Sequence, residues 1–342
     1  MAHEVPADRH DFHREPGRGR HAHKPQQIPP RGWLDIALRV KEQLTTDNAS
    51  IVAAGLALHS LLALFPALTA IVLLYGLFSS PDDITQQLES LQGFLPAEGL
   101  TILERQLGEL ASQRKQTLGF GLLTAMLVAL WSARKGMVAL MTATNVAYDE
   151  EEHRGFFKRL FISLAFTGGA VLGFLAVVAF GVAVPIVLGF LPLGQAANLV
   201  ILVLRWVALW LIAVLGLSIV YRFAPDRHEP KWRWVSWGSA IAATLWLVGS
   251  LLFALYLRRF GATYGETYGA LGGMVIMLLW LYLSAYLVML GAQINAEMER
   301  QTLRDTTTGP EKPMGKRGAY AADTVGPTRG ERDASSRDEP RG

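Results

Sequence analysis

The 342-residue chain contains no cysteine, and long parts of it contain no charged residue. Without cysteine there is no disulfide framework, no thiolate nucleophile and no Cys-ligated zinc or iron–sulfur cluster. Charged residues make up only 18% of the chain, although 32 basic and 29 acidic side chains are present. A soluble helix carries charges along one face, so long uncharged stretches predict membrane spans. Six such stretches, 167 residues in all, run over 48–81, 116–133, 160–204, 206–221, 234–257 and 267–296.

Six spans are expected, because a bilayer core of about 30 Å needs about 20 helical residues. The stretch over 160–204 has 45 residues and is punctuated by Pro and Gly between 185 and 194, so it predicts a helical hairpin. Pro66, near the middle of the first span, predicts a tilted or kinked helix. The fold class is therefore an all-α polytopic membrane bundle. Its spans are expected at about 51–78, 118–133, 160–184, 197–221, 235–257 and 268–295.

Lys and Arg lie mainly on one side of this six-span arrangement. The loops and tails on that side hold 26 of the 32 basic residues, and the loops on the other side hold 6. Positive loops stay in the cytoplasm, so both termini are expected to be cytoplasmic. This distribution also accounts for the pI of about 9.1, and no nucleic-acid partner is expected. The first 50 residues lack the apolar core of a cleaved signal, so the first span is expected to direct insertion.

The soluble segments are expected to be simple. Residues 1–31 and 301–342 are rich in charge, Gly and Pro without apolar periodicity, which predicts disordered cytoplasmic tails around a membrane domain over 32–300. An amphipathic helix on the membrane surface is expected from Trp33, with apolar residues at helical spacing through Leu44. The outer loop 79–117 predicts two further amphipathic helices. They form either a solvated cap on the ends of the bundle, or a lid or partner-docking surface.

Polar residues in and near the spans are the candidate binding or transport residues, because ionisable groups in a membrane are costly. His59, in the first span, is a candidate proton relay, or else a neutral imidazole bonded to a neighbouring helix. The acidic run 149–152 beside His153 could attract a divalent cation, although it also complements the dipole of the next helix. No catalytic residue, metal site or cofactor is predicted. The candidates are His59, Asn145, Tyr148, Arg154, Tyr221, Arg222, Tyr268, Gly269, Asn295 and Glu297.

Several local patterns together resemble the YihY/BrkB family of bacterial inner-membrane proteins, once called ribonuclease BN. The patterns are 53–66 (AAGLALHSLLALFP), Asn145 and Tyr148 followed by Glu152, Arg154 and Arg159, Tyr221-Arg222-x-x-Pro225, 268–272 (YGALG), and 278–297 in the last span. The resemblance covers about 33–300. Two positions depart from it: His59 stands where the family usually has an aromatic residue, and Gln293 where it usually has an acid.

The resemblance implies a multi-pass protein of the bacterial inner membrane with a role in transport or envelope maintenance. The leading hypothesis is a non-enzymatic protein that moves a lipid, small solute or ion, because sparse polar groups do not suit a wide aqueous channel. If transport is coupled to protons or cations, His59 and Glu297 are the residues expected to matter. The alternative function is a structural or assembly scaffold that docks an envelope partner through 79–117. The expected partners are the lipid bilayer, a lipid or small-solute or ion substrate, and a second copy of the chain or an envelope partner. Ribonuclease activity is not expected, because a metal-dependent nuclease needs clustered ligands and a basic strand path.

Overall fold

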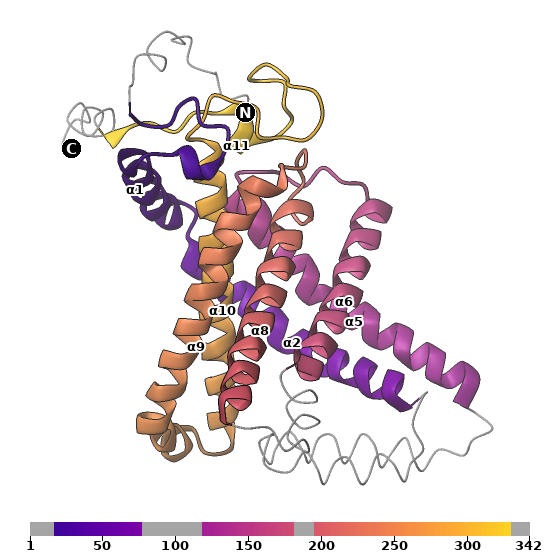
Figure 1. Ribbon diagram of the computed structural model, residues 1–342. Coiled ribbons are helices and arrows are strands. Elements are labelled where there is room, and N and C mark those ends of the chain that lie inside the picture. Colours follow the sequence, from indigo (N-terminus) through magenta and orange to yellow (C-terminus); the bar gives the residue numbers. More distant parts are fainter. Residues whose placement is uncertain (1–16, 77–117, 181–194, 330–342) are drawn as a thin grey trace, which may run out of the picture. The chain divides into compact units, whose positions relative to one another are not determined.

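The computed structural model describes residues 17–76, 118–180 and 195–329, and long helices dominate these ranges (Figure 1). The chain divides into two compact units. The first unit consists of Met1–Ala57, Leu140–Gly155 and Ala176–Gly342, and the second unit of Leu58–Ala139 and Phe156–Leu175. Across the described ranges the only β pairing is an isolated antiparallel bridge between Pro230 and Thr307.

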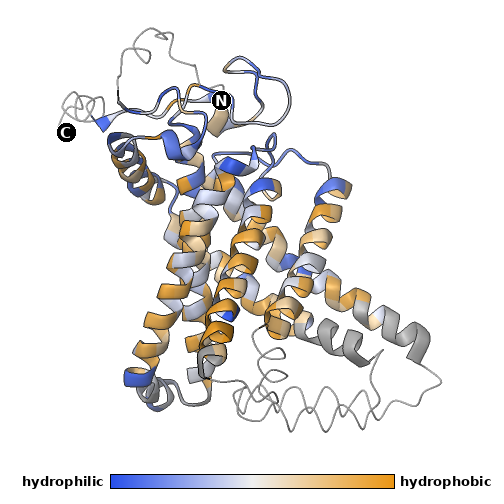
Figure 2. Ribbon diagram, in the orientation of Figure 1, coloured by the Kyte–Doolittle hydropathy of each residue, from blue (hydrophilic) through white to orange (hydrophobic). Residues whose placement is uncertain are grey.

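Five helices of the described ranges are long and apolar enough to cross a membrane. Their apolar lengths are apparent as orange ribbon in Figure 2. A helix satisfies its own backbone hydrogen bonds, so an all-apolar sequence folds this way in lipid. The predicted all-helical membrane fold is confirmed. The five are α2 Ala49–Gly76, α6 Phe156–Val178, α8 Gln195–Phe223, α9 Trp232–Tyr268 and α10 Gly272–Glu299.

The sixth expected span, 118–133, lies within α5 Leu118–Ala147, which is not among the five. The count of six spans and the cytoplasmic position of the termini therefore stay predictions. Helix α5 also continues through Arg134 and Lys135, where the span was expected to end. The outer loop 79–117 and the expected hairpin turn near 185–194 lie outside the described residues.

The expected loop over 258–267 is instead helical. Helix α9 continues for 37 residues to Tyr268, and only the 3-10 turn η4 Gly269–Leu271 separates it from α10. Arg258, Arg259 and Glu266 do not end the helix, because charged side chains are compatible with helical backbone. The backbone turns at Gly269, whose φ of 56° suits glycine.

Helices α8, α9 and α10 of the first unit pack through small residues, with α9 against both of the others. Gly291 of α10 lies against the Tyr221 hydroxyl and the Ala242 methyl group, and any Cβ at 291 would overlap both. One turn further on, Asn295 of α10 accepts a hydrogen bond from the Gly238 N–H (2.9 Å) and donates one to the Val235 carbonyl (3.2 Å). A Cβ at 238 would overlap Asn295, so close approach of α9 and α10 requires glycine at both positions.

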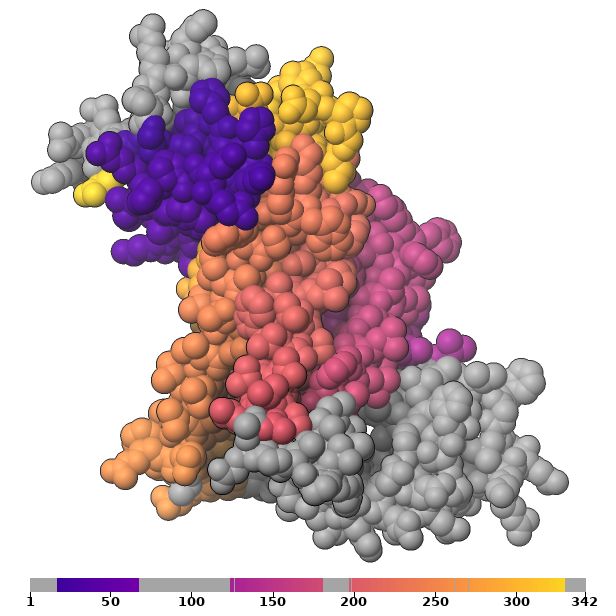
Figure 3. Space-filling model, in the orientation of Figure 1, coloured from indigo at the N-terminus to yellow at the C-terminus, as the bar shows by residue number. Residues whose placement is uncertain are grey.

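A folded cap closes one end of the first unit. We define the cap as residues 17–47, 145–155, 222–231 and 297–329. It includes α1 Pro30–Thr46, which packs against α10, together with the short helices η2 Pro25–Gln27 and α11 Tyr320–Asp323. In Figure 3 the N-terminal residues, in indigo, and the C-terminal residues, in yellow, lie together over the orange helix ends.

The prediction of a disordered tail from residue 301 is wrong for 301–329, and residues 17–31 are folded as well. The Leu303 N–H donates to the Arg20 carbonyl (2.8 Å), and the Gly326 N–H donates to the Arg300 carbonyl (2.9 Å). The buried Arg317 guanidinium donates to four backbone carbonyls, including that of Leu303 (2.8 Å). Side chain–backbone bonds of this kind leave no periodic apolar pattern in a sequence, which is why the fold of these segments was missed.

The second unit contains the rest of α2 and most of α5 and α6. Gly136 of α5 faces Ala63 of α2, where an added Cβ would lie 3.0 Å from the alanine methyl group. Arg134 of α5 lies over the Trp131 ring (4.6 Å) and donates to Ser163 of α6 (3.4 Å). The Arg134 guanidinium is thus held between two helices by a ring and a hydroxyl.

Replacing Gly238 by alanine should destabilise the protein. The added methyl group collides with Asn295, and overpacking of this kind costs about 1–3 kcal/mol, more than the roughly 1 kcal/mol gained in helix propensity. Gly249→Ala on the same helix is the matched control, because its Cβ would lie 3.4 Å from Leu287, an ordinary contact. Thermal unfolding in detergent should give a lower Tm for Gly238→Ala only. Equal Tm values for the two variants would contradict the proposed contact.

Candidate functional site

The end of α10 buries two carboxylates, those of Glu297 and Glu299. Negative charge at a helix C-terminus is unfavourable, because it meets the negative end of the helix dipole. Arginines offset it. Glu297 pairs with Arg39 of α1 and with Arg300 (2.6 Å), and Arg39 also donates to the Gln301 side chain (2.7 Å). The Glu297 carboxylate therefore joins α1 to the end of α10.

Glu299 forms a separate pair with Arg227, and both side chains are completely buried (0% exposed). The guanidinium makes a two-pronged contact at 3.1 and 2.7 Å, and Thr306 donates to the same carboxylate (2.5 Å). Arg227 also lies over the ring of Tyr148, 4.9 Å from its centroid. Burial raises the pKa of Tyr148 well above its usual value, so the phenol stays neutral under physiological conditions.

Asn145, Glu152 and Arg154 tie the end of α5 to the turn between α8 and α9. Arg154 contacts both oxygens of Glu152 (2.6 and 2.7 Å) and donates to the Ala224 carbonyl (2.8 Å). Asn145 donates to Glu152 (3.3 Å) and accepts from the Asp226 N–H (2.8 Å). Burial acts to raise the pKa of Glu152, but the hydrogen bonds and charge of Arg154 together exceed that effect and hold the pKa below its usual range. Arg154 and Asn145 thus bond the 145–155 segment to the turn between α8 and α9.

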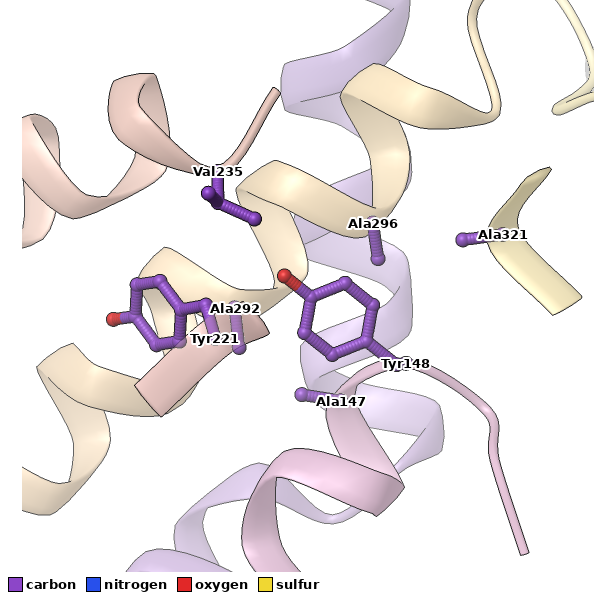
Figure 4. Packing of buried hydrophobic residues seen from close by; sticks show 7 residues of the cluster. All are labelled: Ala147, Tyr148, Tyr221, Val235, Ala292, Ala296 and Ala321. Atoms are coloured by element: carbon purple, nitrogen blue, oxygen red, sulfur yellow. The ribbon is translucent and has the colours of Figure 1, made fainter. Parts of the chain in front are cut away.

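Tyr221 and Tyr148 occupy the base of the cap. Figure 4 shows both rings against the small side chains of α10, at Ala292 and Ala296. The Tyr221 hydroxyl donates to the Val288 carbonyl of α10 (2.8 Å). Arg222, the next residue, donates to the Pro230 carbonyl (2.8 Å) and lies over the ring of Trp232 (4.5 Å).

The structure thus brings seven of the ten candidates to one end of the first unit. Tyr268 and Gly269 do not join them, because they lie at the other end of α9, 30 residues or about 45 Å beyond Gly238. Tyr268 is half exposed there and stacks on Tyr264. His59 is an exposed residue of the second unit. The seven are Asn145, Tyr148, Arg154, Tyr221, Arg222, Asn295 and Glu297.

Two further acidic residues, Asp47 and Glu150, lie near the paired charges. Burial, and to a smaller extent the charge of Asp149, raises the pKa of Asp47 to about 6, although hydrogen bonds from Gln293 and Gln43 act to lower it. Burial raises the pKa of Glu150 to about 7, although the Tyr320 N–H donates to it (2.8 Å). In the described parts of the chain, no three His, Cys, Asp or Glu residues are arranged to hold a metal ion.

An apolar pocket of about 270 Å³ lies between α8, α9 and α10, and its lining residue Leu217 is one turn before Tyr221 on α8. Small residues open it, notably Ala213 and Gly216 of α8 and Ala242 of α9. The indole N–H of Trp246, also in its wall, already donates to Ser284 (2.9 Å). The pocket therefore offers apolar surface without a free hydrogen-bonding group, which suits a hydrocarbon chain.

A set of apolar helices with a charged, folded cap defines an integral membrane protein that crosses the bilayer several times. The chain belongs to the virulence factor BrkB family, whose profile matches residues 40–315. The resemblance found in the sequence is confirmed. The match also extends beyond residue 300, into the part of the cap that was expected to be disordered.

The relatives are bacterial proteins of similar length. Ribonuclease-like protein YfkH of Bacillus subtilis is 31% identical over 264 residues, which cover 75% of this chain and 92% of the relative. A UPF0761 membrane protein of Idiomarina loihiensis is 26% identical over 270 residues, 77% of this chain and 90% of the relative. One of Cronobacter sakazakii is 26% identical over 277 residues, 79% and 89% of the two chains. No solved structure matches the chain.

Sequence reasoning missed the partners of the candidate residues, above all Arg39, Arg227 and Glu299. One signal was available: acids at the C-terminal end of an apolar helix require nearby cations. Their identity was not available, because Arg39 and Glu297 are 258 positions apart. Helix α1 was expected to turn its charges to water, whereas Asp35 and Arg39 are buried.

Breaking the Arg227–Glu299 pair should destabilise the cap severely. Glu299→Ala leaves a buried, unpaired guanidinium, which typically costs about 3–5 kcal/mol. Glu229→Ala is the control: that carboxylate also pairs with an arginine, Arg222, but is 46% exposed, so the cost should stay below about 1 kcal/mol. Unfolding of the purified protein should show a larger loss of stability for Glu299→Ala than for Glu229→Ala. The double variant Arg227→Met/Glu299→Leu should recover much of the loss caused by Glu299→Ala. Equal effects of the two single variants would contradict it.

Stability should also depend on the charge of Glu150. Its folded pKa of about 7 exceeds the ordinary 4.5, so its contribution is fully present below about pH 4.5 and is lost as the pH rises through 7. Glu150→Gln keeps the acceptor for Tyr320 without the charge. It should raise Tm at pH 8 and leave Tm unchanged at pH 4.5, whereas the exposed Glu151→Gln should have no effect at either pH. A Glu150→Gln effect that is the same at both pH values would disprove this assignment.

Proposed function

We propose that this protein binds a lipid chain among α8, α9 and α10 and moves lipid, or helps to move it, across the bacterial inner membrane. The observation that carries the proposal is the apolar pocket of about 270 Å³. It lies inside the apolar lengths of all three helices, between Ala213 and Leu217, Ala242 and Trp246, and at Leu287 and Val288. Lipid can therefore reach this pocket from within the bilayer.

The lining of the pocket favours lipid over a polar solute. A sugar or amino acid would lose its hydrogen bonds to water there without replacing them, at a cost of roughly 1–3 kcal/mol for each group. An acyl chain has no such groups. The volume of the pocket equals that of about nine water molecules of about 30 Å³ each. This is room for a segment of an acyl chain.

The polar candidates are better suited to structure than to conduction. Glu297 contacts arginines on two sides, and Asn145, Tyr221, Arg222 and Asn295 each bond to named partners in the protein. A water-filled ion path needs polar groups that face the path. We therefore favour lipid as the substrate class. A role for His59 and Glu297 in proton coupling stays a prediction.

The proposal describes a non-enzymatic protein, although one relative carries a ribonuclease-like name. Metal-stimulated RNA cleavage by the purified protein would contradict it. The alternative of a docking scaffold depends on the loop 79–117, which lies outside the described residues.

Filling the pocket should block lipid movement. Gly216→Leu adds a side chain where open space surrounds the glycine, so the helix should form normally while the pocket is occupied. Movement of a fluorescent phospholipid between leaflets of proteoliposomes should slow by about tenfold, the effect of about 1.4 kcal/mol.

The neighbouring Leu215→Phe is the control, because Leu215 is 58% exposed and is not part of the pocket wall. It should retain the wild-type rate. Wild-type protein without lipid movement, or equal rates for the two variants, would overturn the proposal. Reconstitution levels are compared for all samples, so that a failure of insertion is recognised.

A further inference from the structure

Helix α1 has two different faces. One face is buried in the cap and includes Asp35 and Arg39. The opposite face carries Ala37, Lys41 and Thr45, which are exposed and follow each other at helical spacing. Because α1 ends only two residues before the membrane helix α2 begins, this second face lies where the chain enters the bilayer.

The contacts between α1 and α10 change from charged to apolar along the pair. Glu297 of α10 meets Arg39, and one turn earlier the Gln293 amide donates to Asp47. Leu290 and Tyr286 lie one and two turns further toward the N-terminus of α10, and both line a pocket with residues of α1. This pocket therefore occupies the polar-to-apolar boundary, the depth at which phospholipid headgroups meet their chains.

The pocket has a volume of about 550 Å³ and two kinds of wall. Its polar wall is formed by Lys41, Thr45, Asn48 and Ser50, and its apolar wall includes Leu44 and Leu290. Asn48, with φ of 49°, turns the chain between α1 and α2 at the pocket edge. Helix α2 carries no acidic residue in its first turn.

We propose that this pocket is a binding site for an anionic glycerophospholipid of the adjacent leaflet. The Lys41 ammonium binds the phosphodiester, the hydroxyl and amide groups bind phosphate or glycerol oxygens, and an acyl chain lies along Leu44 and Leu290. A lysine at the membrane surface is a point charge suited to phosphate. A free phosphate would leave the apolar wall uncovered, so a lipid is the better match.

The charge of the pocket selects between lipid classes. None of its lining residues is acidic, so nothing there pairs with the ammonium of a zwitterionic headgroup. An anionic headgroup such as phosphatidylglycerol carries no such cation. Lys41 then faces a net negative ligand, and preference for anionic lipid follows.

This site is separate from the apolar pocket of the proposed function. Tyr286 and Leu290 line one face of α10, and Leu287 and Val288, which line the other pocket, face α8 and α9. The inference goes beyond lipid movement and does not depend on it, so either idea can fail alone.

The test is a titration of the full-length protein in detergent with phosphatidylglycerol and with phosphatidylcholine, in which native mass spectrometry counts bound lipid. The wild type should bind the first phosphatidylglycerol more tightly than phosphatidylcholine. Lys41→Gln should weaken phosphatidylglycerol binding about tenfold, as expected for one charge-assisted hydrogen bond. It should weaken phosphatidylcholine binding less, because the ammonium of that headgroup already offsets the charge of its phosphate. Lys41→Arg should retain most of the affinity.

Lys24→Gln, at the exposed lysine just before η2, is the charge-matched control and should behave as wild type. Ala37→Trp, which fills the pocket from α1, should weaken binding of both lipids. Equal affinities of the wild type for the two lipids, or equal behaviour of Lys41→Gln and Lys24→Gln, would overturn the proposal. Displacement of phosphatidylglycerol by millimolar glycerol phosphate or inorganic phosphate would also overturn it, in favour of a free-phosphate site.

Discussion

The buried pairing of arginine with Glu297 and Glu299 is the constraint on which the rest of the first unit depends. Two carboxylates at the negative end of a helix dipole are unstable in a buried site unless cations reach them. Those cations come from three separate places: Arg39 from α1, Arg227 from the turn after α8, and Arg300 from the chain beyond α10. Satisfying the two charges therefore requires three of the four cap segments to assemble, those with Arg39, Arg227 and Arg300.

The same constraint fixes α10 relative to its neighbours. At the charged end it is held by arginines, and along its length Gly291 and Asn295 bring it into contact with α8 and α9. Its two faces consequently differ in chemistry. Small and apolar residues, together with Asn295, lie toward α8 and α9, and a polar-to-apolar series lies toward α1. Pockets on both faces are then preformed by packing, because α10 has polar anchors on each side.

The sequence was sufficient to locate five long apolar helices and insufficient for the cap. Apolar length alone located α2, α8 and α10 to within four residues at both ends, because hydrocarbon imposes one rule on every residue of a span. The C-terminal ends of α6 and α9 were not located as well, since α6 ends at Val178 and α9 continues to Tyr268. The turn at Gly269 was misplaced because charge at 258–266 was taken to end a helix. The ordered segments 17–31 and 301–329 depend on bonds from Arg20, Asp305, Arg317 and Asp323 to backbone groups, and no spacing rule reports such bonds. The pairing of Arg39 with Glu297 needed three-dimensional information, since adjacency of distant residues is not encoded in local pattern.

Gln293 shows how one neutral residue sets the position of the polar boundary. The family that the sequence resembles usually has an acid there, and in this chain that acid would face Asp47, whose pKa burial and Asp149 already raise to about 6. Another carboxylate would repel it, and it could not donate a hydrogen bond while ionised. The amide instead donates to Asp47 and carries no charge. The charged part of α10 therefore begins at Glu297, one turn beyond Gln293, and the helix is uncharged from Leu290 toward its N-terminus. The pocket beside Lys41 lies at this transition from charged to apolar residues.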